Sequence, residues 1–251
     1  MKNIISIIIP TFNEIKHGYV TKAIDELCNI KDIEIIIVDG GSSDDTYNFC
    51  KSKVKRCFII ENSNRAQRMN YGFKMSTADV ILFHHPRSFL SKHAINELKK
   101  FNASTRKEFW GGFTHQFDSK SMGLRFTSWY SNCIRSKIIK IIYLDHCIFA
   151  SRTLVTKSGG FPEREIFEDT DFSKKLKKFL KPILLKSLSK TSSVRFQKNG
   201  FFIQGIMNQI MKVCYFCHLS DSKMNAIYEK GLSLNNCHGQ AKDFHMASPE
   251  E

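Results

Sequence analysis

The feature of the sequence that most constrains its fold is a run of β-branched residues near the start of the chain. Residues 4–9 read IISIII, and Pro10 follows them directly. A continuous apolar run of this length is typical of a strand that is buried on both faces, as in a parallel sheet. Parallel strands are joined by long crossover connections, usually helices. We therefore expect strands and helices to alternate along this chain.

The residues that follow supply this alternation. Residues 18–29 place Val20, Ala23, Ile24 and Leu27 on one face of a helix. The patterns predict further strands at residues 34–38, 57–61 and 80–84. They also predict one helix that begins at residue 44 and another that covers residues 65–76. Short loops between these segments favour an α/β fold with a largely parallel sheet and right-handed crossovers.

The second half of the chain has mixed patterns. We expect helices at residues 91–101, 152–158, 198–217 and 221–230, strands at 109–117 and 147–150, and a strand pair or loop at 183–197. An acidic cluster at 165–171 precedes a basic helix at 173–181, and 121–141 form a basic amphipathic helical segment. Because no linker-like stretch interrupts the pattern, we predict one domain over residues 1–235 and a disordered polar tail over 236–251.

The charge of the chain restricts its partners. Lys and Arg exceed Asp and Glu by 14, which favours polyanionic partners such as nucleic acid, anionic lipid or phosphorylated substrates. The sequence has no recognisable nucleic-acid-binding motif with interleaved aromatic residues, so we expect no nucleic-acid partner. The chain also has no signal-peptide pattern and no apolar run of about 18 residues. These features predict a cytoplasmic location, with peripheral contact at the inner face of the membrane as a further hypothesis.

Polar residues cluster where the predicted strands end. In open parallel sheets, ligands bind beyond the carboxyl ends of the strands. The residues at these positions are Pro10, Thr11, Asn13 and Glu14 after the first strand, Asp39 and Gly40 after the second, and His84, His85 and Arg87 after the strand at 80–84. We therefore expect polar groups from separate loops to meet at one edge of the sheet.

Several of these segments together resemble a known family. The segments, which occur in order, are PTFNE at residues 10–14, VDGGSSDDT at 38–46, NRAQRMNYG at 64–72, DHCIF at 145–149, GGFP at 159–162 and FEDTDF at 167–172. This order resembles the family 2 glycosyltransferases of the GT-A fold, and is most similar to the bacterial arsenosugar-biosynthesis-type subgroup. The resemblance covers about residues 4–230. It implies a Rossmann-like, mostly parallel mixed sheet flanked by helices, with further helices at the C-terminus.

The resemblance also implies a reaction and the residues that perform it. A nucleotide-diphosphate sugar would donate its sugar to an acceptor hydroxyl, with inversion at the anomeric carbon. An inverting transfer needs a base, which the resemblance places in the acidic pair at 168–169; we choose Asp169 as base and Glu168 as its orienting partner. The alternative is that this pair forms only the acidic first turn of a helix, where the dipole favours carboxylates.

The remaining candidates would bind the donor or the acceptor. Asp39, Asn13 and Glu14 would contact the base or ribose, and Gly40 would let the backbone approach closely. Arg65 offers a planar fork for phosphate, and Gln67 and Asn70 lie on the same helix. Asp145 would line the acceptor pocket. For each of these residues, a role in capping, turn formation, packing or solvation is the alternative.

One position departs from the family pattern. His85 matches the family histidine, but Arg87 stands where an aspartate usually binds the divalent cation, Mg²⁺ or Mn²⁺, that bridges the donor diphosphate. We therefore predict no metal ligand set. Arg87 could offset the diphosphate charge itself, or the protein could have lost catalysis and kept nucleotide binding. A transition-metal site at His84 and His85 is a third alternative.

Basic and apolar segments at residues 121–141, 172–186 and 201–217 suggest one more hypothesis. They could rest on an anionic membrane and reach a lipid-linked acceptor. The alternative is that their apolar faces pack on the core and their charges are solvated.

Overall fold

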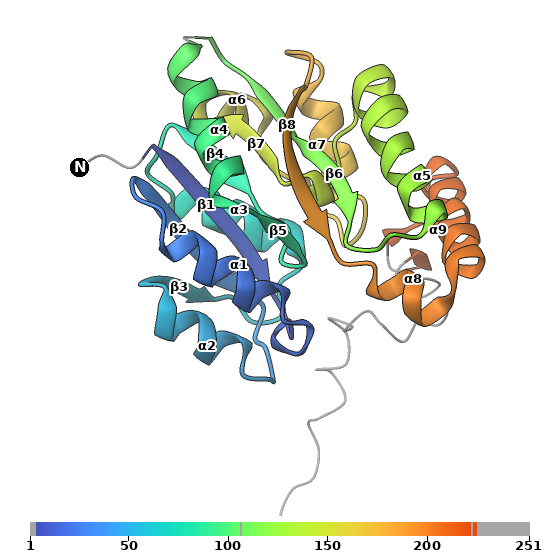
Figure 1. Ribbon diagram of the computed structural model, residues 1–251, viewed down its shortest axis with the longest axis horizontal. Coiled ribbons are helices and arrows are strands. Elements are labelled where there is room, and N and C mark those ends of the chain that lie inside the picture. The colour runs from blue at the N-terminus through green and yellow to red at the C-terminus, as the bar shows by residue number, and fades with distance from the viewer. Residues whose placement is uncertain (1–3, 106, 222, 225–251) are drawn as a thin grey trace, which may run out of the picture.

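The computed structural model describes residues 4–105, 107–221 and 223–224. In this part of the chain an eight-stranded sheet has the order β3-β2-β1-β4-β7-β6-β8-β5 (Figure 1). Its strands are β1 (Ile5–Thr11), β2 (Ile33–Asp39), β3 (Arg56–Ile59), β4 (Val80–Phe83), β5 (Ser88–Leu90), β6 (Trp110–Phe117), β7 (Ile148–Ser151) and β8 (Ile183–Thr191).

The sheet combines a parallel half with a mixed half. β1 pairs in parallel with β2 and β4, and β2 pairs in parallel with β3. β7 runs antiparallel to β4 and β6, whereas β6 and β8 are parallel and β5 is antiparallel to β8. The predicted α/β fold is therefore confirmed, and the parallel arrangement applies to the first four strands. β6 and β8 approach each other so closely at Gly111 that a Cβ atom there would lie 1.9 Å from the carbonyl oxygen of Ile183, so a side chain at this position would force the strands to shift.

Helices cover both faces of the sheet. On one face α1 (Tyr19–Cys28), α2 (Thr46–Lys53) and α4 (Lys92–Ser104) pack against Ile5, Ile7 and Ile9. On the other face α3 (Arg65–Met75), α6 (Arg152–Ser158) and α7 (Glu168–Leu176) pack around Ile8. Alternate residues of β1 thus belong to two cores. Burial of all seven β1 residues explains why the run is largely apolar, and its two polar side chains, Ser6 and Thr11, donate to the buried carboxylates of Glu34 and Asp39.

The helical segments differ in part from the expectations. Residues 121–141 form α5 (Met122–Tyr130) and then a π-helix, η2 (Ser131–Ile139). Residues 183–197 form β8 and the helix α8 (Val194–Asn199) instead of a strand pair. The helix expected to begin at residue 173 is α7, which begins at Glu168 and includes the acidic cluster in its first turn. The three-residue strand β5 was not predicted, because its pairing with β8 is distant in sequence.

The last described helix, α9 (Phe201–Phe216), confirms the predicted apolar helix and lies near α5 beside β6 and β8 (Figure 1). Short 3-10 turns, η1 (Ile15–His17) and η3 (Leu144–His146), complete the described elements. No helix among the described residues is long and apolar enough to cross a membrane. Most of the helix predicted at 221–230, and all of the tail predicted at 236–251, lie outside the described residues.

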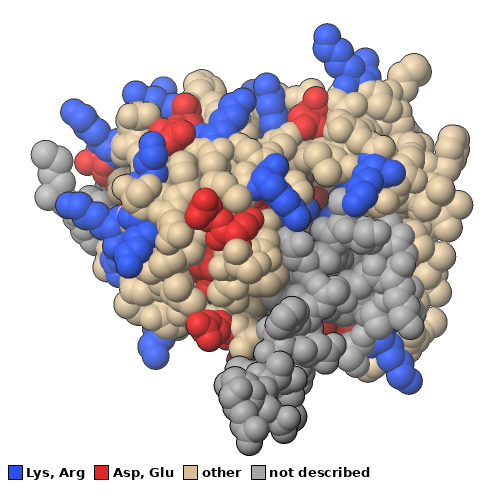
Figure 2. Space-filling model, turned by 90° about the horizontal axis from the view of Figure 1, so that it is seen from below, with Lys and Arg blue, Asp and Glu red and all other residues tan. Residues whose placement is uncertain are grey.

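Figure 2 shows one face of the molecule, seen from below the view in Figure 1. Lys and Arg side chains are spread over this face, and a group of Asp and Glu side chains lies among them. Among the described residues on this face, the positive charge therefore forms no single continuous stripe.

Candidate active site

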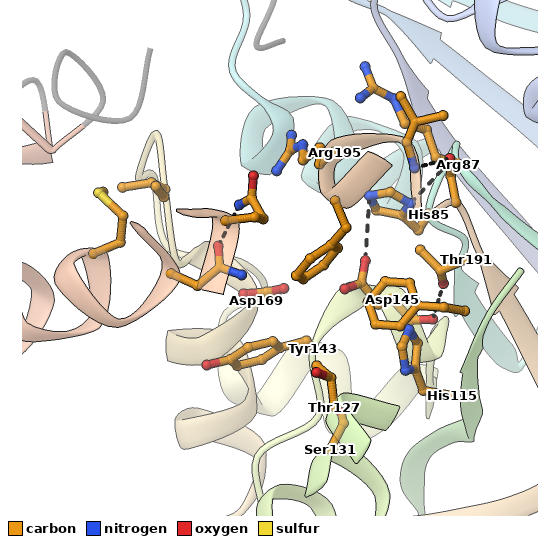
Figure 3. Close-up of a pocket in the computed structure, with 18 of the residues that line it drawn as sticks. His85, Arg87, His115, Thr127, Ser131, Tyr143, Asp145, Asp169, Thr191 and Arg195 are labelled. Atoms are coloured by element: carbon orange, nitrogen blue, oxygen red, sulfur yellow. Dashed lines mark hydrogen bonds and ion pairs between the residues drawn. The ribbon is translucent and has the colours of Figure 1, made fainter. Parts of the chain in front are cut away.

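A cavity of about 920 Å³ lies beyond the carboxyl ends of β1, β4, β6 and β8. Figure 3 shows side chains from several separate segments pointing into it. The sequence-predicted residues that line it are Pro10, Glu14, Arg65, His85, Arg87, Asp145 and Asp169. The structure therefore brings the proposed base and four of the predicted charged binding residues into one cleft, namely Glu14, Arg65, Arg87 and Asp145.

Asp39 lies next to the cavity but is turned toward its own loop. Its buried carboxylate accepts hydrogen bonds from Thr11 Oγ1 at 2.7 Å and from the backbone N–H groups of Gly41 and Ser42 at 3.0 and 2.7 Å. Neither Thr11 nor Asp39 is among the described residues that line the cavity wall. In this structure both residues hold together the loops that follow β1 and β2.

Asn13 has a similar bridging role. Its side-chain oxygen accepts from the backbone N–H groups of Ser43 and Asp44 at 2.9 and 3.3 Å. Its φ of 52° lies in the left-handed region, which Asn tolerates better than most residues. Asn13 also lies outside the described lining of the cavity. It ties the first loop to the second and so fixes the edge on which Glu14 sits.

Gln67 and Asn70 position α3 and the turn that precedes α7. Gln67 forms a capping box with Asn64, in which each side chain bonds the other residue's backbone N–H. Asn70 donates to the carbonyl of Phe161 at 2.8 Å and accepts from its N–H at 2.9 Å. Neither side chain is part of the described cavity lining.

Arg68 lines the cavity and was not among the predicted site residues. It is buried, and its Nη1 donates to the carbonyl oxygen of Thr11 at 3.1 Å. A Cβ on Gly40 would lie 2.0 Å from this Nη1, so Gly40 leaves the space that Arg68 occupies. Burial, together with the charge of Arg65, lowers the pKa of Arg68 to about 10, which still leaves it cationic at neutral pH. Because Arg68 follows Arg65 by three residues on the same helix, the two side chains share a face, and this spacing could have indicated that Arg68 also lines the cavity.

Arg65 and Glu168 join α3 to α7. Arg65 Nε donates to Glu168 Oε1, and the Glu168 side chain is fully buried. Its second oxygen, Oε2, has no hydrogen-bond partner among the described residues. The preceding residue, Phe167, has a φ of 61°, an uncommon conformation for a bulky side chain. This left-handed residue turns the chain so that α7 begins at the cavity.

Asp169 lines the cavity in the first turn of α7. Its Oδ2 accepts from the Leu144 N–H at 2.9 Å, and its Oδ1 accepts from the Thr170 N–H at 2.6 Å. Burial and the negative charge of Glu168 raise the pKa of Asp169 to about 6. A carboxylate with a pKa close to the working pH combines sufficient basicity with ionisation, as general-base catalysis requires.

Arg87 is paired with Glu14 at the edge of the cavity. The Arg87 Nε donates to Glu14 Oε2 at 2.7 Å, and both side chains are largely buried. Burial raises the pKa of Glu14, although the Arg87 charge opposes this shift. The backbone N–H of Arg87 donates to His85 Nδ1 at 3.1 Å, which assigns the proton of the neutral imidazole to Nε2. That Nε2 lies 3.8 Å from Asp145 Oδ1 (Figure 3).

The residues at this edge do not fit a divalent cation. His84 is absent from the described cavity lining, and the Nδ1 atom of His85 already accepts from the backbone N–H of Arg87. Among the described residues, no group of three or more His, Cys, Asp or Glu could hold a metal ion. The cation Arg87 is instead ion-paired at this edge.

The cavity also contains cations from the second half of the chain. Arg135, Arg195 and Lys212 line it, together with the aromatic side chain of Tyr143. The guanidinium of Arg135 lies 3.9 Å from the centre of the Tyr143 ring. The sequence indicated a basic amphipathic segment at 121–141, but the π-helix η2 changes which of its residues face inward.

Comparisons with known proteins agree with this architecture. The model of glycosyl transferase family 2 matches residues 6–151, more than half of the chain. An uncharacterized glycosyltransferase of Rickettsia typhi is 30% identical over 176 residues, which make up 66% of this chain and 54% of the relative. The chain therefore spans about half the length of the curated relative that it matches.

Solved structures of other proteins are similar in fold, and two of these proteins serve as examples. Crystal structures of S. aureus TarS 1-349, including its complex with UDP-GlcNAc, align over 92% of this chain with 16% identity; for that complex the TM-score is 0.61 and 71% of the solved chain is covered. The mannosyltransferase PcManGT from Pyrobaculum calidifontis, in complex with GDP-Man and Mn²⁺, aligns over 84% of this chain and 65% of its own with 12% identity and a TM-score of 0.55. The family model, which matches more than half of the chain, assigns it to glycosyl transferase family 2.

Proposed function

We propose that this protein transfers a sugar from a nucleotide-diphosphate sugar to an acceptor hydroxyl, with inversion at the anomeric carbon. The observation that carries this proposal is the position of Asp169, whose pKa is raised to about 6, in the same cleft as Arg65, Arg68 and Arg87. Cationic side chains suit a diphosphate, and a carboxylate that ionises near neutral pH suits the removal of a hydroxyl proton.

The proposed reaction is a single displacement. Asp169 takes the proton of the acceptor hydroxyl while the acceptor oxygen forms a bond to the anomeric carbon. The bond between that carbon and the diphosphate oxygen breaks, and its electron pair leaves with the nucleoside diphosphate. Glu168 is a positioning residue, because it holds Arg65 and raises the pKa of Asp169.

In this proposal Arg87 stabilises the leaving diphosphate directly. A guanidinium is permanently charged and can form paired hydrogen bonds with phosphate oxygens. Glu14 accepts from Nε of Arg87 and so orients the side chain at the cavity. Arg65 and Arg68 provide further positive charge near the same groups.

The comparisons support a nucleotide-sugar donor in general terms. TarS has been solved with UDP-GlcNAc and PcManGT with GDP-Man, so uridine and guanosine donors are both reasonable choices. The order of the sequence motifs favours the arsenosugar-biosynthesis-type subgroup, which we retain as part of the proposal.

Membrane contact is a further part of the proposal. Helices α5 and α9 expose apolar side chains, among them Met122, Trp129, Ile203 and Phe216, and the exposed Phe126, Phe202 and Ile206 also line the cavity. An amphipathic surface with nearby Lys and Arg suits peripheral binding at the inner face of an anionic membrane. A lipid-linked acceptor would be delivered from that surface. Flotation with anionic and with neutral vesicles tests this contact.

The rival function is nucleotide binding without catalysis, which the cation at position 87 favours. Transfer assays with UDP- and GDP-linked sugars, each with and without EDTA, separate the two functions. We expect nucleoside diphosphate release that needs acceptor and persists in EDTA. A thermal shift with nucleoside diphosphate but no turnover of any donor would support the rival function. Loss of transfer in EDTA would contradict the role of Arg87.

A further inference from the structure

Arg135 and Lys212 form a second cationic site in the cavity, separate from Arg87. Arg135 comes from η2 and Lys212 from α9. The Nε atom of Arg135 is buried and has no hydrogen-bond partner among the described residues. The guanidinium lies 3.9 Å from the centre of the Tyr143 ring, and a guanidinium can bind a planar or tetrahedral anion through its edge.

Lys212 lines the same cavity as Arg135. Burial and then the Arg135 charge lower the pKa of Lys212 from its ordinary value. The Lys212 ammonium donates to Gln209 Oε1 at 3.4 Å, near the upper limit for a hydrogen bond. Within the described part of the chain, neither cation has a carboxylate within ion-pair distance. Two cations in one cavity without such a partner favour the binding of an anion.

Arg135 contacts the Tyr143 ring. Figure 3 shows Tyr143 beside Asp169, with Asp145 near them and the His85–Arg87 pair farther away. An anion on Arg135 would therefore lie near the proposed base. This position differs from that of the donor diphosphate near Arg87.

An apolar wall adjoins the second cationic site. The cavity is lined there by side chains of α5, α8 and α9, namely Phe126, Phe196, Phe201, Phe202 and Ile206. Phe202 is 80% exposed and Ile206 is 61% exposed, so this wall continues to the protein surface. Large exposed apolar side chains beside a charged pocket indicate a ligand that is apolar at one end.

We propose that the acceptor is an amphiphilic anion, with a phosphate or carboxylate bound by Arg135 and Lys212 and an apolar group on the α5–α9 wall. This inference rests on the proposed function and specifies the class of its acceptor. The acceptor hydroxyl would lie close to the acidic group, within reach of Asp169.

Alkyl phosphates of increasing chain length test the inference by direct binding. Isothermal titration with hexyl phosphate, below its micelle concentration, is done with and without saturating UDP or GDP. We expect binding in the presence of nucleotide, far weaker binding of hexanol and of inorganic phosphate, and a severalfold gain for each added methylene. Binding of hexyl phosphate only by displacement of nucleotide, or equal binding of hexanol, would overturn the inference.

Variants separate this site from general charge effects. Arg135→Gln and Lys212→Gln should each weaken the binding of hexyl phosphate about ten- to a hundredfold. The exposed controls Arg125→Gln and Lys137→Gln should leave its affinity unchanged. If Arg135→Gln does not fold, Arg135→Lys keeps the charge, and its affinity should lie between those of the wild type and Lys212→Gln. Unchanged affinity in folded Arg135→Gln overturns the inference. Absence of nucleotide binding, with intact hexyl phosphate binding, would instead contradict the proposed function alone.

Discussion

Arg65 Nε donates to the buried carboxylate of Glu168, which joins α3 to the first turn of α7 across 103 residues of sequence. This ion pair lies directly beside Asp169. The negative charge of Glu168 raises the pKa of Asp169, and the positive charge of Arg65 opposes it. The pair therefore sets both the position and the ionisation of the proposed base.

Glu168→Gln should shift the pH dependence of transfer. Loss of the Glu168 charge leaves Arg65 to act on Asp169 alone, so the pKa of Asp169 falls. The acidic limb of the kcat/KM–pH profile should move from about 6 toward lower pH. The exposed Glu163→Gln on the preceding loop is the control. A limb that stays in place in Glu168→Gln would contradict the coupling.

Asp169 should also leave a pH signature in stability. Its pKa of about 6 in the folded protein lies above the ordinary 3.8, so the folded state binds this proton more tightly than the unfolded state. The resulting stabilisation is present at pH below 3.8 and is lost as pH rises through about 6.

Denaturant unfolding of wild type and Asp169→Asn at several pH values measures this term. As the pH rises from 4 to 7, the free energy of unfolding of the wild type should fall by about 1–2 kcal/mol relative to that of the variant, after allowance for the partial exposure of Asp169. Any constant offset from changed hydrogen bonds does not affect this difference. Parallel curves across the whole range would show that the pKa of Asp169 is not raised.

The Glu14–Arg87 pair should behave as a coupled unit. Arg87→Met leaves the Glu14 carboxylate largely buried without its partner, which costs about 3–5 kcal/mol in such pairs. The double variant Glu14→Gln/Arg87→Met should recover much of that stability but not transfer activity. Additive losses in a double-mutant cycle would exclude strong coupling.

Gly40→Ala should act through Arg68. The added Cβ would lie 2.0 Å from Arg68 Nη1, so the guanidinium must leave its place under the loop. We expect weaker nucleoside diphosphate binding, measured by titration, and no further loss when Gly40→Ala is added to Arg68→Met. Full additivity of the two affinity losses would mean that Gly40 acts independently of Arg68.

Much of the fold could be predicted because its signals are local. The apolar run of β1 and the helical spacing of Val20, Ala23, Ile24 and Leu27 each reflect burial of neighbouring residues. By contrast, β5 depends on pairing with β8, and the start of α7 depends on the left-handed Phe167 and the Arg65–Glu168 pair. Such tertiary effects leave no periodic pattern in the sequence.

The site shows the same division. The predicted strand ends identify the loops that surround the cavity. Which hydrogen bonds the polar side chains of these loops form is seen only in the structure. The carboxylate oxygens of Asp39 accept hydrogen bonds from Thr11 and from the loop that follows β2. The side chain of Asn70 donates to the backbone carbonyl of Phe161. Arg135 could not be assigned because the π-helix changes the face on which it lies.

The most direct test of the central claim is the rate of acceptor-dependent nucleoside diphosphate release in EDTA. Wild type should turn over, and Asp169→Asn should be slower by about a hundredfold to ten-thousandfold with donor binding retained. Full activity in Asp169→Asn would contradict the assignment of the base.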